Sequence, residues 1–201
     1  MFTQDLFDKG VALANLRNFT EALDCFNEVL KINPDNADAL YNKGVALAAL
    51  GEYEEAIYYY EQSLRINPYN ADALNNLGVA FAALKKYDEA IRYFDKVLAM
   101  NPYQELVLIN KGGALAKLKK YDEALLYFDE ALRINPDNAD VLYNKGVTLA
   151  NLGRFKEAIV WYDQVLRINP HNVDAFNNKG VAYAAMGNFD YAIGFDPPDH
   201  S

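Results

Sequence analysis

Apolar residues recur at steps of three and four along most of this chain, with one break in the middle of each stretch. In residues 37–70 the apolar positions follow this spacing on both sides of Gly51. Such spacing gathers apolar side chains on one face of an α-helix. The segment therefore predicts two amphipathic helices joined by a tight turn at the glycine.

Polar residues and proline mark the ends of this predicted helix pair. The first helix opens after Pro34, Asp35 and Asn36, where an Asp or Asn side chain can accept from the free amides of the first turn. The residue before a proline is disfavoured in the helical conformation. The Asn-Pro pairs therefore predict where the second helices end, at Asn33, Asn67, Asn101, Asn135 and Asn169.

The whole pattern returns at one constant interval without a slip. Proline recurs at Pro34, Pro68, Pro102, Pro136 and Pro170, and glycine at Gly10, Gly44, Gly78, Gly112, Gly146 and Gly180. Because each copy has the same neighbours, these residues are not scattered groups brought together into one active site. The period predicts an array of one structural unit, in which each copy packs on the next.

Small and large residues predict how a helix pair packs. Gly44 and its equivalents lie in the first helix, and Ala56 and its equivalents, Ala192 included, lie in the second, so we expect small residues to face small residues. Large residues fill the remaining space. They are Leu40, Leu47, Tyr53, Tyr60, Leu64 and Ile66, with counterparts Leu74, Phe81, Tyr87, Phe94, Leu98 and Met100.

The stretch LYNKGVALAALGEYEEAIYYYEQSLRINP strongly resembles the tetratricopeptide repeat, with its Gly, Tyr, Ala, aromatic and Pro signature positions. The resemblance covers nearly the whole chain and implies an all-α fold, a right-handed superhelical solenoid of antiparallel helix pairs. A single array is expected over 3–193. Its repeats are 3–36, 37–70, 71–104, 105–138 and 139–172, with a partial sixth over 173–193 and a non-repeat tail over 194–201.

Composition and charge exclude several classes of function. The chain has no apolar run of about 18 residues and no signal pattern at MFTQDLFDKG, so we expect no membrane contact and a cytoplasmic location. A net charge of −9 argues against nucleic acid. Cys25 is the only cysteine, so neither a disulfide framework nor a cysteine metal site is available, and we expect it to be a partly buried apolar residue.

Signatures of catalysis are missing as well. His171 and His200 are the only histidines, neither is spaced as a metal ligand, and no phosphate-binding glycine loop occurs. The acidic residues recur with the repeat, so they follow helix position, whereas a catalytic pair needs an environment of its own. The sequence therefore predicts a non-enzymatic protein with no cofactor.

An asparagine recurs once per repeat, two positions before the glycine of the first helix. This asparagine ladder consists of Asn42, Asn76, Asn110, Asn144 and Asn178, with Asp8 in the first repeat. The resemblance implies that first helices line a concave surface that holds extended or helical segments of other proteins. Since an amide side chain both donates and accepts, the ladder can pair with a peptide backbone. The alternative is hydrogen bonding between repeats.

Residues beside the ladder describe the expected groove. Tyr41, Asn75, Ile109, Tyr143 and Asn177 adjoin it, followed by a floor of Val45, Val79, Gly113, Val147 and Val181 and then Ala48, Ala82, Ala116, Ala150 and Ala184. The small side chains of this floor leave room for a ligand. The alternative is that they only allow the first helices to pack around a tight inner curve. At the edge, Asp38, Asp72, Asp140 and Asp174 favour a basic or amide-rich ligand, or else stabilise the helix starts.

The fourth repeat departs from the others. Leu106 replaces the recurrent aspartate, Ile109 replaces Tyr or Asn, Gly113 replaces valine, and Lys117 stands where Ala or Asn recurs. We hypothesise a pocket there for one large apolar partner side chain, with random divergence as the alternative.

Two further sets of residues bear on the partner. The carboxylate clamp of some members of the family is not expected, because its cation places hold Phe7, Tyr41, Asp72 and Asn76. Recurrent lysines at Lys9, Lys43, Lys111, Lys145 and Lys179 are expected to lay their stems over apolar surface with the amines in water, or to contact an anionic partner.

The C-terminus interrupts the repeat. The run Gly194-Phe195-Asp196-Pro197-Pro198 breaks the second helix, which predicts uncapped ends. We expect either a fragment of a longer array or a homo-oligomer formed through these ends. Two functions remain. The favoured one is an adaptor that binds a protein or peptide segment; the alternative is a self-assembling module, or a substrate-recruiting fragment of a larger protein such as a glycosyltransferase.

Overall fold

The computed structural model describes residues 2–188 of the 201-residue chain. These residues form eleven α-helices and no strand. The helices are α1 (Phe2–Asn15), α2 (Phe19–Ile32), α3 (Ala37–Ala49), α4 (Tyr53–Ile66), α5 (Ala71–Ala83), α6 (Tyr87–Met100), α7 (Glu105–Lys117), α8 (Tyr121–Ile134), α9 (Ala139–Asn151), α10 (Phe155–Ile168) and α11 (Val173–Ala185). The all-α prediction is confirmed.

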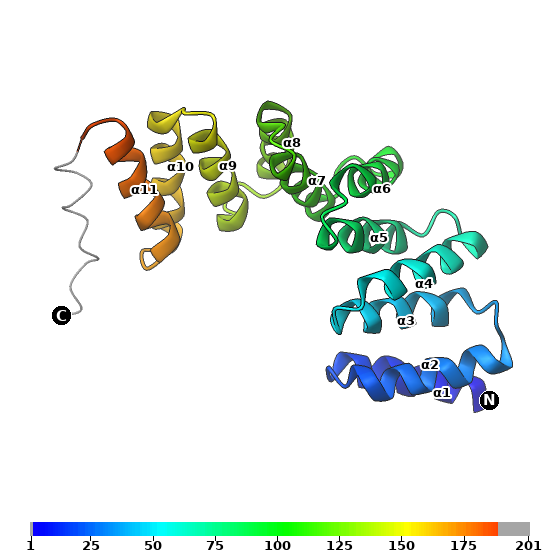
Figure 1. Cartoon of the computed structure of the whole chain (residues 1–201). Coiled ribbons are helices and arrows are strands. Elements are labelled where there is room, and N and C mark those ends of the chain that lie inside the picture. Colours follow the sequence, from blue (N-terminus) through cyan, green and yellow to red (C-terminus); the bar gives the residue numbers. More distant parts are fainter. Residues whose placement is uncertain (1, 189–201) are drawn as a thin grey trace, which may run out of the picture. The chain divides into compact units, whose positions relative to one another are not determined.

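The chain divides into two compact units, Met1–Pro102 and Tyr103–Ser201. Each predicted full repeat supplies one helix pair, so α1–α6 belong to the first unit and α7–α11 to the second. Figure 1 shows the paired helices of each repeat running side by side in opposite directions. A single array over 3–193 stays a prediction.

Within each unit the helices form two layers. The odd-numbered helices contact one another, α1 with α3 and α3 with α5 in the first unit, and α7 with α9 and α9 with α11 in the second. Each even-numbered helix packs against the odd-numbered helices that precede and follow it in its own unit. Within either unit, as far as the structure describes it, the even-numbered helices do not contact one another. The odd-numbered helices therefore form the tighter layer, whose exposed side we call the first-helix face.

The predicted helix ends are confirmed. The Oδ1 of Asn36 accepts from the backbone N–H of Ala39 at 2.9 Å, and Asn70, Asn138 and Asn172 cap their helices in the same way. The second helices stop before Asn33, Asn67, Asn101, Asn135 and Asn169. The turn residue Gly51 has a φ of 85°, in the left-handed region that favours glycine.

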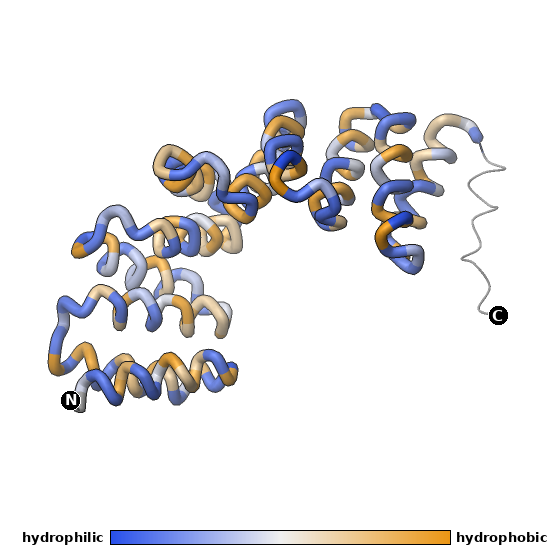
Figure 2. The backbone as a smooth tube through the Cα atoms, turned by 180° about the vertical axis from the view of Figure 1, so that it is seen from behind, coloured by the Kyte–Doolittle hydropathy of each residue, from blue (hydrophilic) through white to orange (hydrophobic). Residues whose placement is uncertain are grey.

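Hydrophobic and hydrophilic residues alternate around each helix, as Figure 2 shows. Leu40, Leu47 and Tyr60 are buried as expected. The prediction is wrong for Ile66 and Met100, which are 44% and 45% exposed. Both are the last residues of second helices, past the last buried position of each helix, Ser63 in α4 and Val97 in α6.

The recurrent glycine of each first helix faces an aromatic ring rather than only a small residue. A Cβ atom on Gly44 would lie 2.7 Å from the ring of Tyr60 and 3.3 Å from the backbone oxygen of Ala56. The same contact recurs between Gly10 and Phe26, Gly78 and Phe94, Gly112 and Phe128, and Gly146 and Tyr162. The expectation that small faces small is therefore incomplete. The alanine lets the backbones approach, and the ring fills the space over the glycine.

Tyr60 and Tyr162 hold their hydroxyl groups in this packed layer. Burial, followed by the neighbouring Tyr41, raises the pKa of Tyr60, and burial, followed by Tyr143, raises the pKa of Tyr162 to about 12. An unfolded tyrosine ionises near pH 10. Above that pH the unfolded chain releases protons that the folded chain keeps, so the free energy of unfolding falls as pH rises.

We expect Gly112→Ala to lower the free energy of unfolding by roughly 1–2 kcal/mol, because overpacking against the buried Phe128 ring outweighs the better helix propensity of alanine. The matched control is Gly113→Ala, whose new Cβ would meet no atom within 4 Å. It should raise stability by about 0.5–1 kcal/mol. Urea denaturation followed by circular dichroism measures both. Equal effects of the two substitutions would contradict the ring contact.

We expect the double variant Tyr60→Phe with Tyr162→Phe to resist alkaline unfolding. Phenylalanine occupies the equivalent place in three other repeats, so the fold should be kept. Between pH 10 and 12 the variant should lose roughly 1–3 kcal/mol less stability than the parent chain. Thermal unfolding across this pH range tests it, with Tyr58→Phe and Tyr69→Phe, both exposed, as the control. A loss as steep as in the parent chain would show that these hydroxyls do not govern the alkaline transition.

Candidate functional site on the first-helix face

The asparagine ladder lies on the first-helix face of each unit. Asn42 and Asn76 lie on α3 and α5 of the first unit, and Asn110, Asn144 and Asn178 lie on α7, α9 and α11 of the second. All five side chains are half-buried. Four of them, Asn42, Asn76, Asn144 and Asn178, fall into two kinds according to whether the side chain bonds to another repeat.

Two ladder asparagines are tied to the preceding repeat of their unit. The Nδ2 of Asn76 donates to the Tyr41 hydroxyl at 3.0 Å, and the Nδ2 of Asn178 donates to the Tyr143 hydroxyl at 2.8 Å. In both cases the acceptor stands on the first helix of the preceding repeat. For these two positions the structure shows the hydrogen bonding between repeats that the sequence left open as an alternative.

Two other ladder asparagines have no such tie. Asn42 donates to the backbone oxygen of Asp38 on its own helix at 2.8 Å. The residue that corresponds to Tyr41 in the preceding repeat is Phe7, whose ring packs beside Phe26 as that of Tyr41 packs beside Tyr60, but which offers no acceptor. For Asn144 the corresponding residue is Ile109.

The two units thus repeat one arrangement, with the second copy three repeats after the first. Within the part of the chain that the structure describes, the Asn144 side chain makes no hydrogen bond. In each unit an apolar residue, Phe7 or Ile109, precedes an untied asparagine. A tyrosine then precedes a tied asparagine.

The tyrosines of this face are held firmly. The Tyr41 ring lies 6.0 Å from the Tyr60 ring, and the Tyr143 ring lies 6.1 Å from the Tyr162 ring. Burial raises the pKa of Tyr41, the charge of Asp72 raises it further, and the hydrogen bond from Asn76 opposes both. Tyr41 therefore accepts a hydrogen bond from Asn76 of the next repeat while its ring packs on Tyr60 of its own repeat.

The floor of the face is small and partly open. Val45 and Val147 are half-buried, whereas Val79 and Val181 are exposed. The row of alanines at Ala48, Ala82, Ala116, Ala150 and Ala184 is half-buried throughout. The face next to the ladder therefore carries small apolar side chains that are partly accessible to solvent.

Residues of the fourth repeat lie along α7. Leu106, in its first turn, is 61% exposed, Ile109 is half-buried, and Lys117 is exposed at its end. A Cβ atom on Gly113 would meet no atom within 4 Å. The missing side chain thus leaves open space, and the pocket for a large apolar group stays a prediction.

The recurrent aspartates lie in the first turns of their helices. Asp38, Asp72 and Asp140 lie on α3, α5 and α9, and none of them is buried. This position suits stabilisation of the helix start by the dipole. Contact with a basic ligand stays a prediction.

The recurrent lysines correct the sequence analysis. Lys111 and Lys145 are only 8% exposed, so these two side chains are buried rather than laid over the surface with a free amine. Lys145 forms an ion pair with Asp129 on α8 and lies 3.6 Å from the centre of the Trp161 ring on α10. Lys179 pairs with Asp163 at 2.6 Å.

These lysines tie adjacent repeats together by polar contacts that a leucine at the same place does not make. Lys43 donates to the Asn27 side chain at 2.5 Å and to the Tyr59 hydroxyl at 2.7 Å. The sequence did carry this signal. A polar acceptor stands on the helix before Lys43 and Lys145, and an aromatic residue stands at the matching place on the helix after each.

Other candidate chemistry gives no site. Among residues 2–188, no group of three or more His, Cys, Asp and Glu could hold a metal ion, and no helix is long and apolar enough to cross a membrane. Cys25 is buried, as expected. Ala192, the tail 194–201 and His200 lie outside the described residues, as does the interrupted second helix on which the expected self-association rests.

Comparison with protein-family models finds tetratricopeptide repeats across the chain. One model matches residues 7–71 and 109–173, a second matches 71–104, and a third matches 161–194. A comparison with curated protein sequences found no significant match.

Solved structures similar to this chain are themselves helical repeat proteins. One is YrrB, described as a tetratricopeptide repeat protein with an unusual peptide-binding site; it is 28% identical, with a TM-score of 0.70 over 84% of this chain and 87% of that one. A MamA structure labelled AMB-1 is 25% identical, with a TM-score of 0.75 over 82% and 98%. PilF of Pseudomonas aeruginosa is 23% identical, with a TM-score of 0.79 over 94% and 86%.

The helix pairs, the recurrent signature residues and the family models agree on one assignment. Proteins of this fold are in general non-enzymatic scaffolds that bind protein or peptide partners. The chain belongs to the tetratricopeptide repeat family and has the fold of a protein-interaction scaffold.

Proposed function

We propose that this protein is a non-enzymatic adaptor that holds an extended or helical segment of a partner protein on the first-helix face. The observation that carries the proposal is the division of the asparagine ladder. Asn42 and Asn144 are not tied to another repeat, whereas Asn76 and Asn178 are. Each unit then has its own contact point for a peptide, centred on its untied asparagine.

The chemistry of an untied amide suits a peptide backbone. Its N–H group donates to a peptide carbonyl and its oxygen accepts from a peptide N–H, without reading the side chains of the ligand. The hydrogen bond from Asn42 to the backbone oxygen of its own helix leaves its Oδ1 available as an acceptor. The valines and alanines nearby supply apolar surface for the ligand to bury.

The tied asparagines have a supporting role in this proposal. Asn76 and Asn178 hold the hydroxyls of Tyr41 and Tyr143, whose rings are already fixed by Tyr60 and Tyr162. Each untied asparagine thus follows directly after a tyrosine whose ring and hydroxyl are both held in place, Tyr41 before Asn42 and Tyr143 before Asn144. We call this tyrosine a rigid wall of the site. Because little side-chain motion is lost on binding, such a wall favours affinity.

The charge of the face favours a basic or amide-rich segment. Asp38 and Asp140 stand one helical turn before Asn42 and Asn144, on the same side of their helices. Neither carboxylate is buried. The similarity to YrrB, described as a peptide-binding protein, supports a peptide ligand for this chain also.

We expect peptides selected from a random library on the purified chain to bind through the untied asparagines. Loss of one hydrogen bond is worth about 1 kcal/mol, so a double variant with Asn42→Ala and Asn144→Ala should weaken each peptide about fivefold per site. Fluorescence polarisation of labelled peptides measures the affinities.

The matched control for this experiment is Asn76→Ala with Asn178→Ala. It should lower the free energy of unfolding by about 1 kcal/mol for each lost hydrogen bond while weakening peptides less than the first variant does. Peptide affinities that are unchanged by Asn42→Ala with Asn144→Ala, in a variant with unchanged circular dichroism, would contradict the proposed function.

We also propose the apolar pocket beside Gly113. Filling the open space with Gly113→Val should reduce the affinity of selected peptides that carry a large apolar side chain by about four- to fifteenfold, the value of one or two buried methylene groups. Affinity for peptides without such a side chain should not change. An unaltered affinity for both peptide classes would show that no pocket forms there.

A further inference from the structure

A groove lies between two second helices of the second unit, away from the first-helix face. It runs between α8 and α10, and Lys145 and Leu149 of α9 form its floor. Two adjoining cavities of about 480 Å³ and 390 Å³ make up the groove and share Asp129 and Trp161 as lining residues. Because no residue of the groove belongs to the asparagine ladder, its use would be separate from the proposed peptide site.

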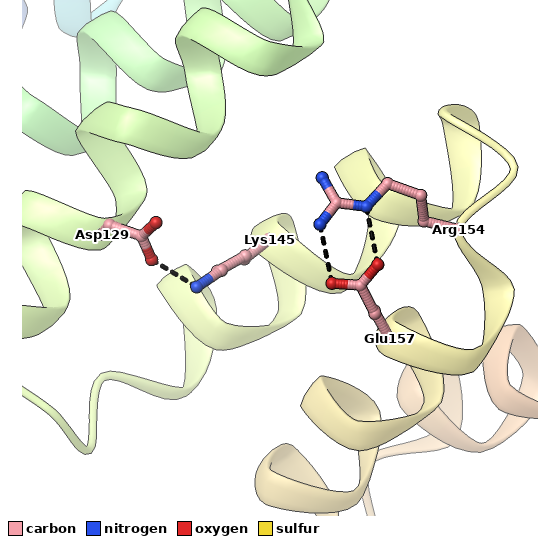
Figure 3. A network of polar contacts seen from close by, with 4 residues as sticks. All are labelled: Asp129, Lys145, Arg154 and Glu157. Carbon is pink, nitrogen blue, oxygen red and sulfur yellow. Dashed lines mark hydrogen bonds and ion pairs between the residues drawn. The ribbon is translucent and has the colours of Figure 1, made fainter.

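An ion pair with no net charge, Lys145 with Asp129, lies at the floor of the groove. Lys145 is buried, pairs with Asp129 and lies over the Trp161 ring. Figure 3 shows this pair beside a second one, in which Arg154 binds Glu157. The two hydrogen bonds of that second pair measure 2.7 and 2.6 Å.

The mouth of the groove keeps an excess of negative charge. Four carboxylates and two cations line the larger cavity, and the two cations are paired with Asp129 and Glu157. The excess therefore rests on Asp122 and Glu123, both exposed in the first turn of α8. The charge of Arg154 also acts on Asp122, and Arg133 lines the smaller cavity, but the carboxylates of the larger cavity still outnumber its cations by two.

Apolar surface lies next to this charge. Leu126, one turn after Asp122 and Glu123, is 63% exposed and lines the same cavity. Trp161 lines the same cavity and is half-buried. A long side chain with an apolar stem and a cationic end complements these neighbouring surfaces, with its stem against the apolar residues and its cation against the carboxylates.

We propose that this groove binds a lysine or arginine side chain of a basic, leucine-bearing segment of a partner protein. The cation lies against Asp122 and Glu123, and its methylene groups lie over Leu126 and Trp161. Anionic ligands are disfavoured by the charge of the mouth. A purely apolar ligand is disfavoured because it would have to strip water from Asp122, Glu123 and the two ion pairs.

The experiment uses Trp161, the only tryptophan of the chain, as a probe inside the groove. The full chain is titrated with an acetylated, amidated peptide of three Ala-Lys-Lys-Leu units, and separately with the same peptide carrying glutamate for each lysine. We expect a saturable change in tryptophan emission with the basic peptide and none with the acidic one.

Two variants of equal charge locate the binding. Asp122→Asn with Glu123→Gln should weaken the basic peptide about five- to tenfold, since each exposed ion pair contributes modestly. The matched control is Glu54→Gln with Glu55→Gln, the equivalent positions two repeats earlier on α4, and it should leave the affinity unchanged. Leu126→Gln should weaken the peptide as well.

Clear outcomes would overturn the proposal. One is no emission change with the basic peptide. Another is equal weakening by the two charge variants, which would indicate general attraction to an acidic chain. A third is loss of the signal in the Asn42→Ala and Asn144→Ala variant, which would place the peptide on the first-helix face instead.

Discussion

Contact between a helix glycine and an aromatic ring is the constraint on which the rest of this structure depends. In five helix pairs a ring from the second helix occupies the place where a Cβ atom of the first helix would stand, within 2.6 to 2.7 Å. The glycine costs helix propensity, and the buried ring offsets that cost. Because the contact sets how closely the two backbones approach, it also helps to position the residues that α1, α3, α5, α7 and α9 contribute to the first-helix face.

The same contact leads outward to the candidate site. The Tyr60 ring lies against Gly44, Tyr41 packs beside Tyr60, and the Tyr41 hydroxyl accepts from Asn76 of the next repeat. In the second unit Tyr162, Tyr143 and Asn178 repeat this order. Where the preceding residue is Phe7 or Ile109, the chain of contacts ends without a hydroxyl acceptor, and the asparagine is left untied. A tyrosine at this place thus ties the asparagine of the next repeat, and Phe7 or Ile109 does not.

Much of this architecture could be predicted from the sequence. The repeat period, the Asn-Pro ends and the capping asparagines depend on local chemistry, which a repeated sequence shows directly. Contacts between helices were harder to predict. The partner of Lys145 stands on α8 and that of Asn76 stands on α3, and both pairings depend on how helices cross rather than on the period. The burial of the Lys111 and Lys145 side chains was mispredicted for this reason.

The most direct test of the account is a nuclear magnetic resonance titration of the side-chain amides. The chain is labelled with ¹⁵N, its asparagine NH₂ signals are assigned by substitution, and a peptide selected on the purified chain is added. The account predicts large shifts for Asn42 and Asn144 and smaller ones for Asn76 and Asn178, whose amides already donate to tyrosine. Shifts that are largest at Asn76 and Asn178, or absent from all four, would contradict it.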